Sequence, residues 1–403
     1  MKELSQSQRV LHWVIISLIA ACYMLPQLQY FIRIQQLAVI TFVYAIIFIV
    51  REDIKSFIVL KYSIPYILTM FLVGYSLDFK YGLFHPFLLM WNIIFPAILC
   101  SFVIRKDDAI LNKLIILTTI ILFLFVGYQT IGQFADNNMI ARMMTSGDTD
   151  EDYKAEMMLL GVGGFGLSYC AGIYLLISLI LFKKFRITKI EAAITVLLLV
   201  VSIYLAYNSM FTTLIIITTF TILFFFYINS NTALKKTLMI FLFLGLVFLL
   251  PMLLNLLSDL TADTPVGDHF KELHNKFYGA NNIASERDQY SVQSISAFIE
   301  SPIWGHNVSS GYYRYLSNNS HSTFWSTIIQ TGLIGVISYF LCCLKAFKLN
   351  IADVDKDLYK QIYLPIILYY ALLSFFNPSD FYEISWAVFL ITPLLFSTYP
   401  VKK

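Results

Sequence analysis

The chain has 403 residues, of which 58% are hydrophobic and 13% are charged, and its mean hydropathy is +0.72. Soluble globular proteins carry about a quarter charged residues, so this composition excludes an ordinary soluble protein. The net charge is +3, and we expect no nucleic-acid partner. The five cysteines all fall in apolar segments and form no C-x-x-C pair, which argues against a disulfide framework or a cysteine metal site.

Long apolar runs predict an all-α polytopic membrane protein, because a spanning helix needs about 20 mostly apolar residues. The first run lacks a small-residue cleavage site, so we interpret it as a retained helix and not as a signal peptide. We predict about twelve spans, at 10–31, 34–50, 57–78, 83–104, 114–134, 159–182, 192–208, 210–229, 237–257, 323–347, 362–377 and 382–399.

The loops between these spans alternate in charge. One set of loops, which includes both ends of the chain, holds 20 of the 28 Lys and Arg residues. The other set holds the remaining eight, together with 16 of the 25 acidic residues. Because Lys and Arg stay on the cytoplasmic side during insertion, we expect both termini to be cytoplasmic.

Two polar segments are long enough to interrupt the pattern, and both are expected on the extracytoplasmic side. The shorter is about 135–158 and the longer about 258–322. We therefore divide the chain into spans one to nine (1–257), a large extracytoplasmic loop subdomain (258–322) and spans ten to twelve (323–403).

The large loop contains a predicted amphipathic helix at about 285–301. Val292, Ile295, Phe298 and Ile299 recur there at helical spacing, and this apolar face is expected to pack on the membrane domain or to lie at the interface. Arg287 then falls in the first turn, where free N–H groups, the helix dipole and a guanidinium favour an anion such as phosphate. The alternative is a local pairing of Arg287 with neighbouring acids.

His321 directly precedes the tenth predicted span, with Ser320 or Ser322 as the expected helix cap. A helix N-terminus disfavours the imidazolium form, so the ring is expected to stay neutral and able to accept a proton from a hydroxyl group. The alternative is a histidine that only caps the helix or lies at the interface. His306 and Asn307, in the stretch "WGHN", are further candidates of the same polar loop.

The order of these residues resembles the shared region of bacterial O-antigen polymerases and O-antigen ligases. That region has an arginine before an aliphatic helix, a P-x-x-G turn, a histidine and a helix with G-[LIV]-[LIV]-G. The matching residues are Arg287, Pro302 with Gly305, His321 with Ser322, and Gly332 to Gly335, within "IESPIWGHN" and "SHSTFWSTIIQTGLIGVISYFL". The resemblance covers about 60 residues.

The resemblance implies a polytopic GT-C-like glycosyltransferase that uses a polyprenyl-diphosphate donor and needs no metal or other cofactor. Family roles place the base, or acceptor-orienting group, at His321 and the diphosphate-binding group at Arg287. The family asparagine after the histidine is replaced here by Ser322. Many relatives also carry an arginine midway along the chain, where this sequence has Asn208-Ser209-Met210.

A diphosphate carries several negative charges, so a second cation is expected. Arg314, seven residues before His321, is the first candidate, followed by Lys80 at a predicted helix end; Arg142 is a further one.

The expected function is polymerisation of undecaprenyl-diphosphate-linked oligosaccharide repeat units on the periplasmic face of the bacterial inner membrane, with inversion at the anomeric carbon. The expected partners are lipid-linked donor and acceptor, the membrane, a chain-length regulator and a flippase. One alternative is an O-antigen ligase that transfers the glycan to lipid A–core. Another is a polysaccharide flippase or transporter, although Asp78, Glu191 and Glu383 all lie near span ends and not at mid-membrane.

Overall fold

The computed structural model describes most of the chain. The described residues are 5–74, 84–134, 137, 139–144, 149–209, 211–262, 267, 270–271, 274–275, 284–308, 311–319, 322–351, 356–379 and 381–402, with the backbone alone given for a few of them. Helices account for nearly all of these residues. Within these ranges the only β-type pairing is an isolated bridge between Phe185 and Val401.

The helices follow one another closely in the first half of the chain. They are α1 (Gln6–Met24), α2 (Pro26–Phe31), α3 (Ile34–Tyr44), the π-helix η1 (Ala45–Ile49), α4 (Val50–Asp53), the 3-10 helix η2 (Ile54–Tyr62), α5 (Ile64–Thr69), the π-helix η3 (Met70–Gly74), α7 (Phe84–Arg105), α8 (Ala109–Phe134), α9 (Ile140–Met143) and α10 (Glu151–Leu159).

The second half contains longer helices. They are α11 (Phe165–Lys184), α12 (Lys189–Asn208), α13 (Thr212–Ile228), α14 (Ala233–Leu260), α16 (Ala284–Glu300), α17 (Gly311–Asn319), α18 (Thr323–Leu349), α19 (Lys356–Phe376), α20 (Tyr382–Trp386), the π-helix η4 (Ala387–Ile391) and α21 (Thr392–Thr398).

The protein is an all-α, multi-pass membrane protein. Among the described residues, seven helices are long and apolar enough to cross a membrane, and three shorter apolar helices accompany them. The seven are α1, α7, α8, α11, α12, α18 and α19. Helical residues occupy each of the twelve predicted ranges, although several of these ranges are built from shorter pieces, such as η2, α5 and η3.

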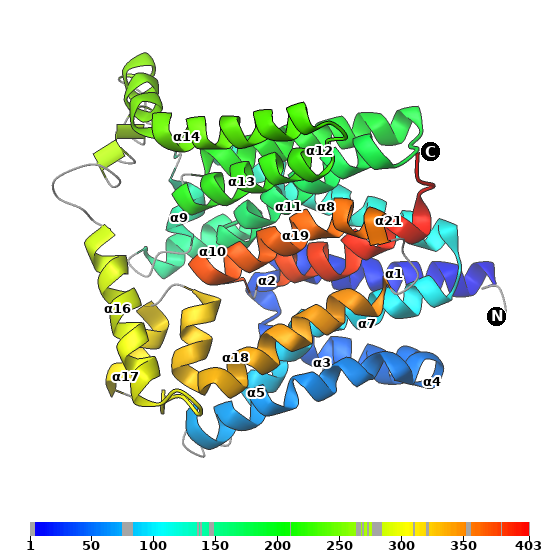
Figure 1. The fold of residues 1–403 in the computed structure, drawn as a ribbon. Coiled ribbons are helices and arrows are strands. Elements are labelled where there is room, and N and C mark those ends of the chain that lie inside the picture. Colours follow the sequence, from blue (N-terminus) through cyan, green and yellow to red (C-terminus); the bar gives the residue numbers. More distant parts are fainter. Residues whose placement is uncertain are drawn as a thin grey trace.

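The long helices lie side by side, and the chain ends are found together at one end of the bundle (Figure 1). The helices α9, α10, α16 and α17 lie at the opposite end (Figure 1). The polar segments therefore gather at the end of the bundle away from the termini.

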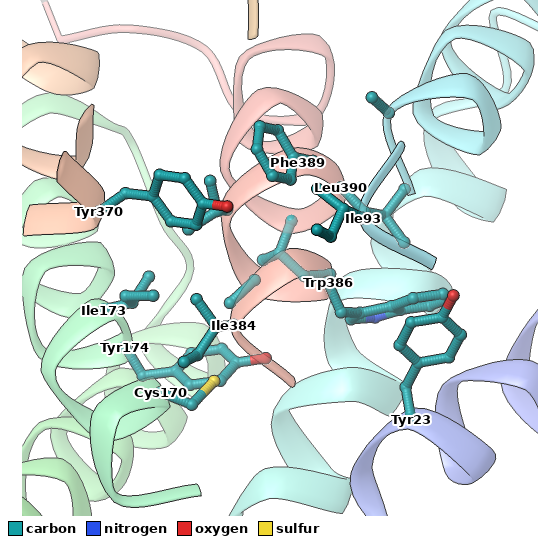
Figure 2. Packing of buried hydrophobic residues seen from close by; sticks show 14 of the residues in the cluster. Tyr23, Ile93, Cys170, Ile173, Tyr174, Tyr370, Ile384, Trp386, Phe389 and Leu390 are labelled. Carbon is teal, nitrogen blue, oxygen red and sulfur yellow. The ribbon is translucent and has the colours of Figure 1, made fainter. Parts of the chain in front are cut away.

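The core of the bundle is centred on α11, in which 15 of the 20 residues are buried. Figure 2 shows Cys170 and Tyr174 of this helix beside Ile384, with Trp386 and Tyr23 packed further along. A Cβ atom at Gly172 would lie 2.3 Å from the hydroxyl oxygen of Tyr369, so the glycine allows α19 to approach closely. Small residues at helix contacts are the usual means of close packing in membranes.

Three tryptophans, Trp91 and Trp386 buried and Trp13 partly buried, connect neighbouring helices through their indole N–H groups. Trp91 donates to Thr41 Oγ1 over 2.8 Å, Trp13 to Thr118 Oγ1 over 3.1 Å, and Trp386 to Thr119 Oγ1 over 3.2 Å. An indole N–H in an apolar interior is costly unless it is hydrogen-bonded. These bonds therefore fix the lateral order of the helices as well as satisfying the donors.

Ion pairs connect the helices at the end that holds the termini. Arg9 Nε lies 2.5 Å from Asp108 Oδ2, which joins α1 to the start of α8, and Lys113 Nζ lies 3.0 Å from Glu191 Oε1, which joins α8 to α12. Burial alone would raise the pKa of Asp108. The hydrogen bond from Arg9, the backbone N–H groups of Leu111 and Ile110 and the charge of Arg9 together hold that pKa below its ordinary value.

Arg9→Ala is expected to destabilise the protein in a pH-dependent manner. A carboxylate whose pKa is lowered by folding stabilises the folded state at neutral pH, and that contribution is lost as pH falls through the folded-state pKa. The loss runs from the unfolded-state pKa of Asp, about 3.9, down to the lower folded-state pKa, and without Arg9 that pKa rises, so the pH-dependent contribution becomes smaller. We expect the free energy of unfolding at pH 7 to fall by about 1–3 kcal/mol and the difference from the unaltered protein to shrink in acid, measured by thermal unfolding in detergent between about pH 2 and pH 8.

Arg51→Ala is the matched control, because Arg51 is an exposed cation near the same end of the bundle and makes none of the ion pairs described above. Equal losses in the two variants, or a pH profile unchanged by Arg9→Ala, would contradict the role of the Arg9–Asp108 pair.

Candidate functional site

The structure describes some of the predicted site residues, and the helices that carry them, α9, α16 and α17, lie at the end of the bundle away from the termini (Figure 1). His321 and Lys80 lie outside the described residues. Arg287 lies in the first turn of α16, where only the backbone is described. The side chains of Arg142, His306, Asn307 and Arg314 are described.

The centre of this region is a break in α18 at Gly332. Its backbone angles are φ 58° and ψ −157°, and the residues on both sides are helical. A side chain at positive φ is strained, so glycine is the natural residue for such a break. The sequence predicted one continuous span over 323–347. Instead, α18 has a first segment that crosses the end of the bundle and a second that runs along it (Figure 1).

The P-x-x-G turn pairs with the backbone groups that this break exposes. Leu333 N–H donates to the Pro302 carbonyl over 2.9 Å, and Ile334 N–H donates to the Ile303 carbonyl over 3.4 Å. In the opposite direction, His306 N–H donates to the Ile329 carbonyl over 2.8 Å. A break leaves helix-terminal N–H and C=O groups without intrahelical partners, and the turn supplies those partners.

Two glycines allow the turn and the helix to come this close. A Cβ atom at Gly305, where φ is 76°, would lie 2.5 Å from the backbone carbon of Gln330 and the nitrogen of Thr331. A Cβ atom at Gly332 would lie 2.5 Å from the carbonyl carbon and oxygen of Ile303. No real Cβ contact is this short, so the glycine of the turn and the first glycine of G-L-I-G form one interlocked contact.

The second glycine of the same motif has a different role. A Cβ atom at Gly335 would lie 1.9 Å from Thr331 Oγ1, so the space beside Gly335 is filled by the threonine side chain. Thr331 Oγ1 in turn donates to the Thr327 carbonyl over 2.6 Å. The spacing of G-L-I-G thus follows from the break: one glycine makes it and the other accommodates the side chain that precedes it.

The start of α18 is anchored to the end of α19. Ser322, the residue after His321, is the N-cap: its Oγ accepts from Trp325 N–H at 3.3 Å and donates to the Phe375 carbonyl over 2.7 Å. Thr323 Oγ1 accepts from Ser379 N–H at 2.8 Å, and Thr323 N–H donates to the Asn377 carbonyl over 3.3 Å. Of the two expected caps, Ser320 and Ser322, these bonds identify Ser322, and they fix the helix start against the α19–α20 loop.

Helix α17 is held on the first segment of α18 by a small polar cluster. Gln330 Nε2 donates to Ser317 Oγ over 2.5 Å and to Ser326 Oγ over 2.9 Å, and the two serine hydroxyls lie 2.9 Å apart. A second hydrophobic core, separate from that of the bundle, fills the space between α16, α17 and α18. It contains Ala297, Val308, Leu316, Ile328, Ile329 and Val336.

The helix α16 was expected to pack its apolar face on the membrane domain or to place it at the interface, and the structure bears on the first of these two options. Its range, Ala284–Glu300, differs by one residue at each end from the expected one. The side that packs on α17 and α18 includes Tyr290, Ser294, Ala297 and Phe298. Of the predicted apolar face only Phe298 packs there, whereas Val292, Ile295 and Ile299 point outward and are exposed. These three residues therefore do not pack on the protein, and a position at the interface is the expectation that is left for them.

The helices α16 and α17, the turn at 302–305 and the first segment of α18 pack together as one unit. His306 contacts this unit through its ring as well as its backbone. The imidazole stacks on Tyr313 with 3.8 Å between ring centroids, and Nε2 lies 2.6 Å from the Ala297 carbonyl. A carbonyl only accepts, so Nε2 carries the proton and donates. The hydrogen bond from the Tyr313 hydroxyl to Glu300, with a smaller effect of burial, raises the pKa of Tyr313. These bonds fit a positioning role for His306.

The candidate cations belong to different units. Arg314 lies on the exposed side of α17, the helix that packs beside α16 and its Arg287. Arg142 lies at the end of α9, which packs against α8 and α11. Asn307 is exposed next to His306. The helices that carry Arg287 and Arg314 therefore pack together with α18. Arg142 lies on a different helix, α9, which packs on α8 and α11 of the bundle.

Two groups of polar residues were not singled out from the sequence. Ser374, Asn377 and Ser379 hold the start of α18, and their polar run between two spans was the available signal. Glu383 is buried at the start of α20, where Gln29 Nε2 donates to its Oε1 over 3.1 Å. The carboxylate lies close to Gly166, where a Cβ atom would be 2.6 Å from Oε2. In the sequence, Glu383 is a single acid near the end of a predicted span, and no pattern around it indicates that its side chain is buried and hydrogen-bonded.

Comparisons of the chain with protein-family models, with curated proteins and with solved structures find no match. Function is therefore argued from the residues and contacts above.

Gly305→Ala is expected to loosen the turn from α18. Alanine at a positive φ costs about 1 kcal/mol, and overpacking against the backbone of α18 adds about 1–3 kcal/mol. We expect faster hydrogen exchange at the amides of His306 and Leu333. Gly311→Ala is the matched control, because Gly311 has the same φ of 76° but no atom within 4 Å of a Cβ. Equal exchange in both variants would show that the close approach carries no energy.

Proposed function

We propose that the protein is a glycosyltransferase that polymerises undecaprenyl-diphosphate-linked oligosaccharide repeat units. The observation that carries this proposal is the interlocked contact between the P-x-x-G turn and G-L-I-G. These motif pieces lie about 30 residues apart in the sequence and have no local reason to occur together. Their direct pairing, beside the cap that follows His321, explains why the pattern includes them, and it supports the resemblance to O-antigen polymerases and ligases.

The position of the unit suits a lipid-linked donor. It lies at one end of the helical bundle (Figure 1), where the diphosphate of a polyprenyl donor meets water while its hydrocarbon tail stays in the bilayer. The first turn of α16 has free N–H groups and the positive end of the helix dipole, both of which favour an anion. Arg287 in that turn adds a guanidinium, which binds phosphate oxygens in a bidentate manner.

In the proposed reaction His321 removes the proton from a hydroxyl of the acceptor sugar. The hydroxyl oxygen forms a new bond to the anomeric carbon of the donor glycan, and the bond from that carbon to the diphosphate oxygen breaks. The electron pair leaves with the undecaprenyl diphosphate, whose charge is stabilised by Arg287 and by Arg314 or Lys80. Direct attack inverts the anomeric configuration. The donor chain is thereby transferred to the next lipid-linked unit.

The proposal includes a GT-C-like arrangement of twelve spans in the bacterial inner membrane. Both termini are cytoplasmic and the site is periplasmic. Two observations support this orientation. Both chain ends lie at the same end of the bundle (Figure 1), and the set of loops that includes these ends holds 20 of the 28 Lys and Arg residues. A flippase and a chain-length regulator are the proposed partners.

His321→Ala is expected to reduce polymerisation by about 100- to 10,000-fold, the range for loss of a general base. The assay uses purified protein in nanodiscs with an undecaprenyl-diphosphate-linked repeat unit, and the product is a ladder of longer glycans. His274→Ala is the matched control from the same loop. A ladder that survives His321→Ala at unchanged expression would overturn the mechanism, and transfer only to lipid A–core would identify a ligase.

Arg287→Ala is expected to weaken donor use more than Arg287→Lys does, because lysine keeps the charge but loses the bidentate geometry. The loss is expected in kcat/KM for the donor, by about tenfold or more if one charged hydrogen bond of 1.5–3 kcal/mol is removed. Arg142→Ala serves as the control, since Arg142 lies on α9 and outside this unit. An equal effect of Arg142→Ala and Arg287→Ala would assign the diphosphate to a different place.

A further inference from the structure

Helix α16 has its large aliphatic residues on the wrong side for a helix in water. Val292, Ile295 and Ile299 are 66%, 44% and 69% exposed, while Ser294 and Ala297, which face the protein, are 0% and 2% exposed. Positions 292, 295 and 299 follow the spacing of one helix face. A helix on a soluble surface buries its aliphatic stripe and exposes its polar residues, so the outward stripe indicates a second apolar environment.

The exposed stripe continues past the end of the helix. Ile303 and Trp304, in the turn that docks on Gly332, are 52% and 54% exposed. Beyond them, Leu333, Ile337, Leu341 and Leu344 form an exposed row along the second segment of α18. That segment belongs to a membrane-spanning helix, so its exposed apolar row faces lipid. The stripe of α16 is thus joined to a lipid-facing surface through the turn.

The length of α18 gives the depth of the turn. The segment Leu333–Leu349 has about 17 residues, so it is about 26 Å long at 1.5 Å per residue. The hydrocarbon core of a bilayer is about 30 Å thick. Lys348, near the far end of the segment, is exposed and is expected at one edge of that core. Ile303, which is level with Gly332, then lies close to the opposite edge.

The direction of α16 agrees with this depth. Figure 1 shows α16 crossing the end of the bundle at a steep angle to the long helices. Because the long helices cross the membrane, a helix at a steep angle to them lies nearly in the membrane plane. Helices that lie in this plane, with aliphatic and tryptophan side chains on one side, insert that side at the boundary between headgroups and acyl chains.

We propose that α16 is an interfacial anchor: Val292, Ile295, Ile299, Ile303 and Trp304 insert into the outer boundary of the bilayer hydrocarbon. The lipid bilayer is thereby the third surface that holds the unit, together with α17 and the break in α18. This inference does not depend on the proposed glycosyl transfer, because it rests on exposure, direction and depth alone. Its consequence is that the first turn of α16 is held level with the lipid headgroups.

The test is a nitroxide scan along α16 in the full-length protein in nanodiscs. Single cysteines replace Val292, Ile295, Ile299 and, as the control from the flank of the helix, Gln293. The background carries Cys22→Ser, since the other four native cysteines are buried. Collision of the label with oxygen, which concentrates in lipid, is compared with collision with a water-soluble nickel chelate. We expect the oxygen-to-nickel ratio to be higher at the three stripe positions than at position 293.

Two results would overturn the proposal. Nickel accessibility at the stripe equal to that at position 293 would place α16 in water. Low accessibility to both reagents, relieved when the protein is diluted in excess lipid, would show that a second copy of the chain covers the stripe. Because these labels sit at exposed positions, the fold is expected to tolerate them, and unchanged thermal unfolding of each labelled variant checks this.

Discussion

The arrangement at the end of the bundle depends on one break in one helix. At Gly332 the chain leaves helical geometry, and the N–H and C=O groups released there find partners in the turn that begins at Pro302. Unpaired backbone groups near the membrane are costly, so the break and the turn require each other. The glycines at 305 and 332 are the condition for that pairing, because a Cβ atom at either would meet backbone.

The consequences spread from this contact to the helices α16 and α17. The turn fixes the end of α16, and a small core between α16, α17 and α18 fixes the other two helices relative to it. Ser322 and Thr323 then tie the start of α18 to the end of α19. The described helices α16 and α17 thus form one packed unit with the start of α18, as the proposed site requires.

The bundle beneath provides a firm base for this unit. Its central helix, α11, is buried on nearly all sides, and indole N–H groups join neighbouring helices through hydrogen bonds. Ion pairs such as Arg9–Asp108 lie at the far end, near the termini.

Composition and periodicity determined the all-α membrane class and the helix at about 285–301, and they narrowed the cap of α18 to Ser320 or Ser322, because these depend on apolar run length and local hydrogen bonding. The resemblance to O-antigen polymerases and ligases singled out Pro302, Gly305, Gly332 and Gly335. Only the tertiary structure decided that these residues pair with one another, that α18 breaks between them, and that α16 turns its aliphatic stripe outward. The physical reason is that each of these features is set by a contact between segments distant in the chain, and local sequence carries no record of its partner.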